Sequence, residues 1–200
     1  MKEYKKMDDS KIAQSGDEKN NIIKFVTETA EIEGDVAEVG VYEGGTASLI
    51  YSVMNQKKKL FLFDTFDTFV GAGANDPQWI LPAITGPQTI AYPSIVEHFM
   101  PYPNVAVIKG DFPAVIGKTF DNKTFSFVHL DVDIYLPTLN SLKFFYPRIP
   151  KGGVILMHDY FHQDLRGVKI ACEEFFADKP EKVISNPITG SMSQGFIIKQ

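Results

Sequence analysis

The chain has 200 residues, of which 44% are hydrophobic and 22% are charged, and its formal net charge is −5. This length suits one domain with a single large core, and no apolar run approaches the roughly 20 residues that a membrane span needs. The acidic balance argues against a nucleic-acid partner, because binding phosphates calls for a basic surface.

Residues 1–20 are polar and charged, without the apolar core of a signal peptide. We therefore expect a cytoplasmic protein in which residues 1–20 form a tail or a lid over the substrate and residues 21–200 form the folded domain. Cys172 is the single cysteine, so an intramolecular disulfide and a cysteine-based zinc site are excluded. Its apolar helical surroundings predict that it is buried.

The first half of the chain alternates between helical and strand patterns. Apolar residues at helical spacing predict a helix from Asp17 to about Glu31. A short apolar strand follows over Asp35–Gly40, and the glycines at 44 and 45 open a helix to about Gln56. A second apolar strand over Leu60–Phe63 closes at Asp64.

Residues 65–93 lack regular periodicity and are rich in Gly, Pro, Thr and Asn, with isolated large side chains such as Trp79. A connection of this length inside a compact domain is usually functional or disordered. Its aromatic and apolar content favours a folded cap over the substrate.

Strands and helices alternate again in the second half. The pattern predicts a helix at 94–99, strands at 105–108 and 125–130, a helix at 137–146, a strand at 153–157, a helix at 168–176, and closing strands at 182–184 and 195–198. Continuous apolar strands that alternate with helices are typical of a mostly parallel sheet covered on both faces. We therefore predict an α/β, Rossmann-like domain with about seven strands.

Acidic residues follow the ends of five predicted strands, where an open α/β sheet binds its ligand. They are Glu38 beside Gly40, Asp64, Asp111 beside Gly110, Asp131 with Asp133, and Asp159 beside His158. Capping explains one such residue more easily than five, although it remains an alternative for Asp64 and Asp133. His129, inside a strand pattern, is expected to be a buried or face histidine.

The glycine-rich segment after the first strand lacks the Gly-x-Gly-x-x-Gly spacing of a dinucleotide site. A carboxylate at Glu38, two residues before Gly40, suits a cationic group such as the amino group of an amino acid. Asp64 is placed to accept hydrogen bonds from ribose hydroxyls, as acidic residues do in nucleoside-binding Rossmann sheets.

Four motifs together resemble the macrocin O-methyltransferase family. They are Asp-Val-Ala-Glu-Val-Gly-Val-Tyr-Glu-Gly-Gly-Thr from Asp35, Leu-Phe-Asp-Thr-Phe from Leu62, Leu-Asp-Val-Asp-Ile-Tyr from Leu130, and Pro-Lys-Gly-Gly-Val-Ile-Leu-Met-His-Asp-Tyr from Pro150. The resemblance covers residues 35–176 and implies a class I methyltransferase fold that uses S-adenosylmethionine (SAM) and magnesium to methylate sugar hydroxyls on macrolides.

The resemblance also implies roles for individual residues. Glu38, Gly40 and Tyr42 would line the methionine end of SAM, Asp64 would hold the ribose, and Gly110 with Asp111 would border the adenine. The full set expected to bind the cofactor is Glu38, Gly40, Tyr42, Gly44, Thr46, Asp64, Thr65, Gly110 and Asp111. The expected metal ligands are Asp131, His158 and Asp159, and the expected catalytic residues are Asp131 and His158. His158 departs from the family pattern, in which a second Asp is typical, so the metal is left open between Mg and Mn.

The predicted function is O-methylation of a hydroxylated small molecule, assisted by a divalent metal that lowers the pKa of the acceptor hydroxyl and orients it. A metal-independent enzyme with His158 or Asp131 as general base is an alternative, as is a SAM-binding protein without catalysis. A nicotinamide-dependent oxidoreductase is disfavoured by the missing glycine spacing. A homodimer remains open alongside a monomer.

Overall fold

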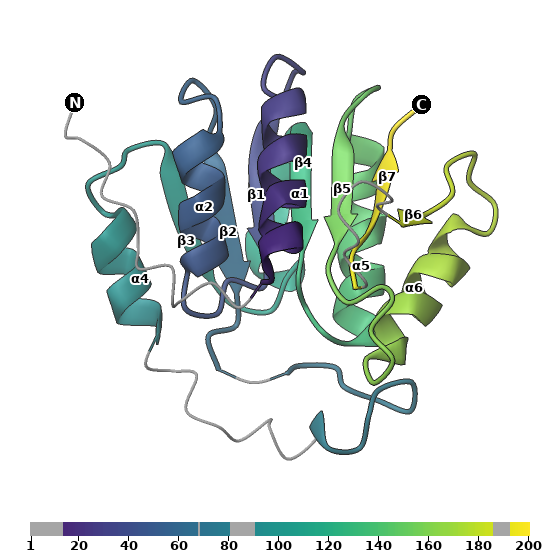
Figure 1. Ribbon diagram of the computed structural model, residues 1–200. Coiled ribbons are helices and arrows are strands. Elements are labelled where there is room, and N and C mark those ends of the chain that lie inside the picture. The colour runs from purple at the N-terminus through teal and green to yellow at the C-terminus, as the bar shows by residue number, and fades with distance from the viewer. Residues whose placement is uncertain (1–13, 68, 81–90, 186–192) are drawn as a thin grey trace.

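A computed structural model describes residues 14–67, 69–80, 91–185 and 193–200 of the chain. The strands form one seven-stranded sheet in the order β3-β2-β1-β4-β5-β7-β6 (Figure 1). The neighbours from β3 to β5 pair in parallel, whereas β7 is antiparallel to both β5 and β6. The predicted fold class is confirmed.

The strands are short apolar runs whose ends agree with the sequence pattern to within about two residues. Their bounds are β1 Asp35–Val39, β2 Leu60–Asp64, β3 Val105–Lys109, β4 Phe125–Leu130, β5 Val154–Met157, β6 Ile184–Ser185 and β7 Gly195–Ile198. All residues of β4 and β5 are buried, because these strands lie inside the sheet with helices on both faces.

The helices cover the two faces of the sheet (Figure 1). Their bounds are α1 Gly16–Glu28, α2 Gly45–Val53, α4 Ala91–Phe99, α5 Tyr135–Phe145 and α6 Arg166–Phe176, and two 3-10 segments, η3 Ala114–Phe120 and η4 Tyr146–Arg148, join them. One apolar core contains side chains of α1, α2 and α4, and a second contains side chains of η3, α5 and α6. The sheet therefore lies between two cores, one on each face.

Individual contacts support this layering. Phe196 of β7 packs on Phe25 of α1 with ring centroids 4.6 Å apart, and Cys172 of α6 is buried in the second core, as predicted.

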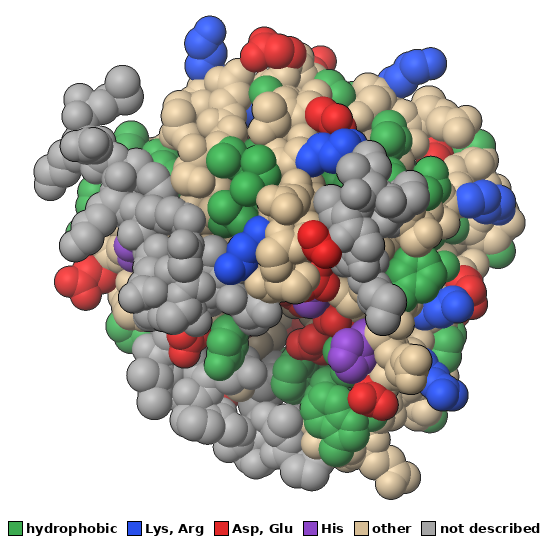
Figure 2. Space-filling model, in the orientation of Figure 1, with side chains coloured by type: hydrophobic (Ala, Val, Ile, Leu, Met, Phe, Trp, Pro, Cys, Tyr) green, Lys and Arg blue, Asp and Glu red, His purple; other side chains and the backbone are tan. Residues whose placement is uncertain are grey.

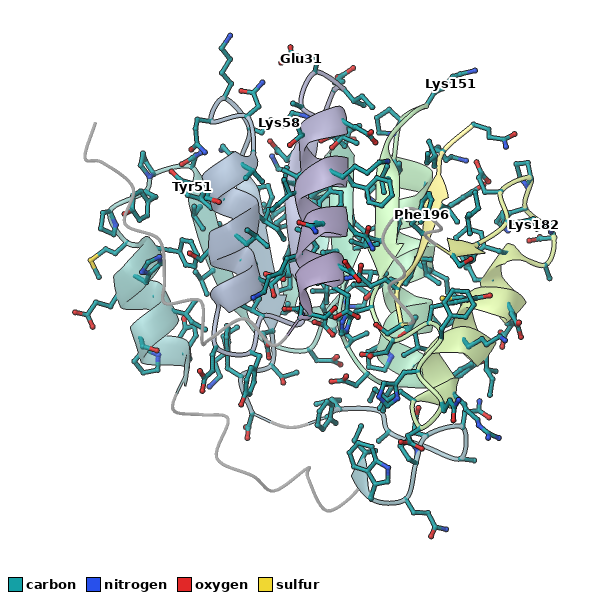
Figure 3. The ribbon with its side chains drawn as sticks, in the orientation of Figure 1. Glu31, Tyr51, Lys58, Lys151, Lys182 and Phe196 are labelled. Atoms are coloured by element: carbon teal, nitrogen blue, oxygen red, sulfur yellow. The ribbon has the colours of Figure 1, made fainter. Side chains whose placement is uncertain are left out.

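Lys58 lies at the amino ends of the strands (Figure 3) and donates to the Thr29 and Ile32 carbonyls at 2.9 and 2.5 Å. These bonds connect the turn before β2 to the segment after α1, so Lys58 has a structural role.

Several helix boundaries differ from the sequence prediction. α1 begins at Gly16, so the predicted limit of the polar tail at residue 20 lies inside a helix. Ser15 and Glu18 form a capping box there, so the helix starts one residue before the predicted Asp17, and it ends at Glu28 instead of about Glu31. α4 begins at Ala91, inside the predicted 65–93 cap.

The described part of the cap, residues 65–67 and 69–80, crosses below the carboxyl ends of the strands (Figure 1). Its side chains Ile80 and Phe69 pack with Ile134 and Leu165. The Asp76 carboxylate accepts a hydrogen bond of 2.7 Å from the backbone N–H of Tyr135, which opens α5. Residue 68 and residues 81–90 of the predicted cap lie outside the described residues. In the part of the chain that is described, no helix is long and apolar enough to span a membrane.

Candidate active site

A cavity of about 380 Å³ lies at the carboxyl edge of the parallel strands. Its walls come from the segments that follow β1 to β5, together with Gln14 before α1 and Phe69 and Val70 of the cap. Figure 2 shows acidic and histidine side chains gathered in the lower half of one face, beside a hollow. The ligand site therefore lies where a parallel α/β sheet is expected to have one.

Most residues predicted to bind the cofactor line this cavity. They are Gly40, Tyr42, Thr46, Asp64, Thr65, Gly110 and Asp111. Gly44 does not line it and instead starts α2 in a left-handed conformation, with φ 78°. Glu38 does not line it either.

Glu38 is fully buried behind the cavity, and its Oε1 lies 3.0 Å from Nδ1 of His129. Its Oε2 has no hydrogen-bond partner among the described residues. Burial raises the pKa of Glu38 to about 7, although the His129 contact opposes that rise. His129 is the buried histidine that was predicted. Its pairing with Glu38 holds Glu38 in the core behind the cavity wall, and the expected contact of Glu38 with the cofactor stays a prediction.

Gly40 is placed where no side chain fits. Its φ is +88°, and a Cβ built on it would lie 1.7 Å from the carbonyl oxygen of Asp131. Its N–H donates to the Phe63 carbonyl at 2.9 Å. The glycine thus lets the ends of β1, β2 and β4 meet behind the cavity.

Asp64 organises the loop after β1. Its Oδ2 accepts hydrogen bonds from the backbone N–H groups of Val41 and Tyr42, at 2.6 and 2.8 Å, and its Oδ1 accepts one from Phe66 at 2.7 Å. A carboxylate has about four acceptor positions, and three are used here. One position therefore remains for a ligand hydroxyl in the cavity, and the expected two-hydroxyl contact with ribose stays a prediction.

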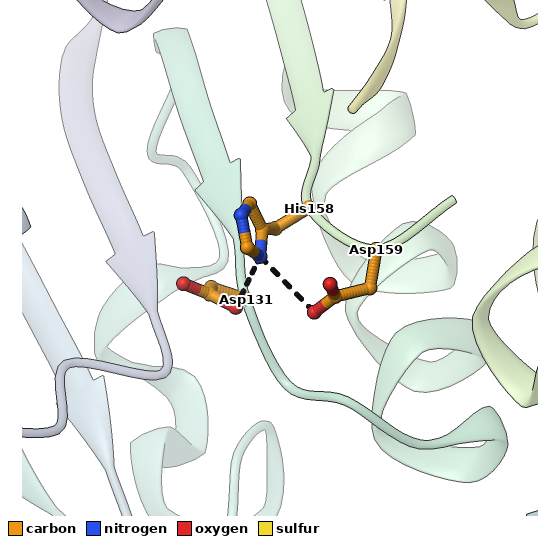
Figure 4. A group of neighbouring side chains, drawn as sticks. All are labelled: Asp131, His158 and Asp159. Carbon is orange, nitrogen blue, oxygen red and sulfur yellow. Dashed lines mark hydrogen bonds and ion pairs between the residues drawn. The ribbon is translucent and has the colours of Figure 1, made fainter. Parts of the chain in front are cut away.

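Asp131, His158 and Asp159 come together at the ends of β4 and β5 (Figure 4). Nδ1 of His158 lies 3.1 Å from Asp131 Oδ1 and 3.0 Å from Asp159 Oδ2. One ligand atom from each residue falls within 4.8 Å of the others. The three residues that the family resemblance implied as metal ligands thus form one cluster.

The charges of this cluster interact strongly because they lie close together in a buried setting. Burial lowers the pKa of His158, but the neighbouring carboxylates, Asp131 first, outweigh it and hold this pKa well above its ordinary value. Asp133, which also lines the cavity, has its pKa raised by burial and by Asp131 and Asp159. Asp133 does not cap α5, whose N-cap position is Ile134 and has no side-chain bond.

The backbone is strained around the cavity. In the described residues, the non-glycine positions with positive φ are Tyr42, Phe66, Asp133 and Asp159, with φ between 48° and 63°. They follow β1, β2, β4 and β5 in turn. Such conformations cost about 1–3 kcal/mol each and cluster at functional sites.

Two site residues, Gln14 and Glu18, were missed in the sequence analysis. The Gln14 amide donates to Asp131 Oδ2 at 2.8 Å and accepts from the Thr46 hydroxyl. Glu18 Oε1 lies 3.4 Å from His158 Nε2. The capping-box spacing Ser15-x-x-Glu18 could have indicated the position of Glu18 at a helix start, but no local signal marks Gln14.

Comparisons with known proteins agree with this geometry. The profile of the family described as Macrocin-O-methyltransferase (TylF) matches residues 16–194. Among solved structures, the O-methyltransferase NovP has a TM-score of 0.74 at 20% identity, over 92% of this chain and 80% of its own. The calicheamicin methyltransferase CalS11 has a TM-score of 0.72 at 16% identity, over 90% and 78%. An O-methyltransferase from Bacillus cereus, solved with SAH, has a TM-score of 0.63 at 12% identity, over 95% and 85%.

The structural likenesses establish the fold, and the profile match extends over most of the chain. No curated protein sequence matches it significantly. On the strength of the profile match, with the seven-stranded sheet and the cavity at its carboxyl edge, this chain belongs to the macrocin O-methyltransferase family.

Proposed function

We propose that the protein transfers the methyl group of SAM to a hydroxyl oxygen of a small molecule of the sugar or natural-product type. The observation that carries this proposal is the acidic cavity in a chain of this family. Its lining includes the carboxylates of Asp64, Asp131 and Asp159, and no lysine or arginine is present among its described lining residues. A sulfonium donor with an ammonium group is attracted to such a surface, whereas the phosphates of a nicotinamide dinucleotide are repelled.

The donor would lie along the segments that follow β1 to β3. Tyr42 and Thr46 would contact its methionine end, Asp64 its ribose, and Gly110 with Asp111 its adenine, all of which line the cavity. The acidic side chains on this path complement the positive charge of the donor.

The acceptor would lie on the side of Asp131 and His158, between the strand ends and the cap. Phe69 and Val70 of the cap line the cavity and supply apolar surface there. CalS11 is a TDP-rhamnose 3'-O-methyltransferase, which supports a sugar-type acceptor. We propose that the cap closes over the acceptor and excludes water during transfer.

In the transfer step, the acceptor oxygen attacks the methyl carbon in line, a C–O bond forms, and the C–S bond breaks to release the neutral thioether S-adenosylhomocysteine (SAH). The hydroxyl proton of the acceptor must leave, because an alcohol that keeps this proton is a poor nucleophile. Asp131 and His158 line the cavity where that proton would be accepted.

The cluster of Asp131, His158 and Asp159 also fits a divalent metal. Ligands about 2.1 Å from an octahedral ion lie about 3 Å from their neighbours, and Nδ1 of His158 lies 3.0 and 3.1 Å from the two carboxylates. We propose that Asp131 and Asp159 would hold the ion with His158 adjacent. A bound ion would lower the pKa of the acceptor hydroxyl.

Metal and proton would compete at His158, because Nδ1 can carry a proton or face a cation but not both. The imidazole also suits manganese or zinc better than magnesium. A metal-independent reaction with His158 or Asp131 as base is therefore the second candidate, and within it the carboxylate contacts that raise the pKa of His158 favour Asp131 as the base.

The first experiment is calorimetric titration with SAH and with NAD(H) and NADP(H), followed by methyl transfer to sugar, catechol and macrolide acceptors. We expect SAH binding, no dinucleotide binding, and turnover with a hydroxylated acceptor. Dinucleotide binding without SAH binding would contradict the proposal, and SAH binding without turnover on any acceptor would favour a non-catalytic SAM-binding protein.

The second experiment measures turnover after exhaustive chelation and after addition of magnesium, manganese or zinc in turn. Asp131→Asn serves as the variant that lacks one ligand. Full turnover in the chelated enzyme would eliminate the metal. Restoration by manganese with little effect of magnesium would place His158 among the ligands.

A further inference from the structure

The first turn of α1 and the residue Gln14 before it contact side chains of the active site. Glu18 is only 9% exposed and lies against His158, and Gln14, 6% exposed, lies against Asp131. These contacts join segments more than 100 residues apart in the chain. The side chains at the strand ends are therefore held in part by the N-terminal region.

We propose that Glu18 is a positioning residue for His158, an inference that rests on the proposed function. The imidazole lies between three carboxylates, with Nδ1 facing Asp131 and Asp159 at 3.1 and 3.0 Å and Nε2 facing Glu18 at 3.4 Å. The contact at Nε2 is an ion pair and not a hydrogen bond, and a charged ring with carboxylates on both sides has one favoured orientation. Glu18 thus directs Nδ1 toward the two aspartates, whether that nitrogen serves a base or faces a cation.

The Glu18 carboxylate is itself fixed. Its Oε2 accepts from the backbone N–H of Ser15 at 2.8 Å, and its Oε1 accepts from the Ser193 hydroxyl. The backbone N–H of Ser15, which does not depend on the serine side chain, and the Ser193 hydroxyl just before β7 therefore set the position of the group that orients His158. In metal sites, a carboxylate on the far nitrogen of a ligating histidine fixes the ring in this way, and its loss costs about tenfold to hundredfold in activity or metal affinity.

The contacts of Gln14 also support the proposed positioning role of Glu18. Its side chain bridges Thr46, at the start of α2, and Asp131, at the end of β4. The segment before α1 is thereby attached to both the donor side and the acceptor side of the cavity. This attachment keeps the first turn of α1, and with it Glu18, against the site.

The test compares Glu18→Gln with two matched controls in the full chain. Asp17→Asn removes the same charge from the same helical turn at an exposed position, and Ser15→Ala removes the serine half of the capping box. For each variant we would measure kcat, KM for SAM, the SAH dissociation constant, the melting temperature, and the side-chain ¹⁵N shifts of His158, recorded without metal.

In Glu18→Gln we expect kcat to fall about tenfold to hundredfold, an altered His158 shift, and an unchanged SAH affinity, while both controls stay close to wild type. Unchanged kcat and His158 shifts in Glu18→Gln would overturn the proposal, as would equal losses in Ser15→Ala. If Glu18→Gln does not fold, Ser193→Ala replaces it and should alter the His158 shift in the same direction.

These outcomes separate the positioning role from the proposed function. If the wild type neither binds SAH nor transfers methyl groups, the proposed function fails. The His158 shifts would still show whether Glu18 orients the ring, because they are recorded without substrate, donor or metal.

Discussion

Replacement of Gly40 by alanine tests how closely β1 and β4 must approach behind the cavity. At this position φ is +88°, and an added Cβ would lie 1.7 Å from the carbonyl oxygen of Asp131 and 2.6 Å from its carbonyl carbon. Real Cβ atoms essentially never approach within 3.0 Å, so the two segments would have to separate by at least about 1.3 Å at the oxygen.

The cost has two parts. A positive φ costs an L-residue about 1–2 kcal/mol. The separation also weakens the bonds from Gly40 N to the Phe63 carbonyl and from Asp131 N to the Val39 carbonyl, each 2.9 Å long, and each such bond contributes about 1 kcal/mol. We therefore expect Gly40→Ala to lower the free energy of unfolding by about 2–4 kcal/mol.

Urea unfolding would measure this change, and turnover would report the displaced Asp131, since a misplacement of about 1 Å can cost about a hundredfold in rate. Gly16→Ala is the matched control, because no heavy atom lies within 4 Å of its added Cβ and its φ is not positive. We expect that control to stay within about 1 kcal/mol of wild type. A Gly40→Ala protein with wild-type stability and turnover would refute the reasoning.

Three further predictions concern other parts of the site. Asp64→Ala should weaken SAH binding by about 1–3 kcal/mol, whereas Asp35→Ala, at the opposite end of the sheet, should leave it unchanged in the same calorimetric titration. In Gly167→Ala the added Cβ would lie 2.2 Å from Asp76 Oδ1, so the cap should shift and KM for the acceptor should rise while SAH affinity is retained. Burial raises the pKa of Glu38 from 4.5 to about 7, so its stabilising contribution is complete below pH 4.5 and is lost as the pH rises to about 7. Glu38→Gln should remove this decline from the pH profile of urea unfolding, and an unchanged profile would contradict the assignment.

The sequence alone indicated the order of the elements and the residue types at the strand ends. The strands at 125–130 and 195–198 have the predicted bounds, and the helix predicted from residue 137 begins two residues earlier, so that Pro137 lies in its first turn. These features depend on short-range periodicity and on residue types suited to turns and helix starts, which a linear pattern records directly. The acidic residues after the strands were visible for the same reason, because each follows an apolar run.

Tertiary structure alone decided which side chains meet. Gln14 contacts Asp131 across 117 positions of sequence, and Glu18 meets His158 only because α1 packs on the sheet beside β4 and β7. Glu38 was expected at the cavity wall, but it turns into the core toward His129 on the neighbouring strand. Such contacts depend on strand order and on the placement of a helix over a sheet face, and both are set by burial of apolar surface throughout the domain rather than by any local run of residues.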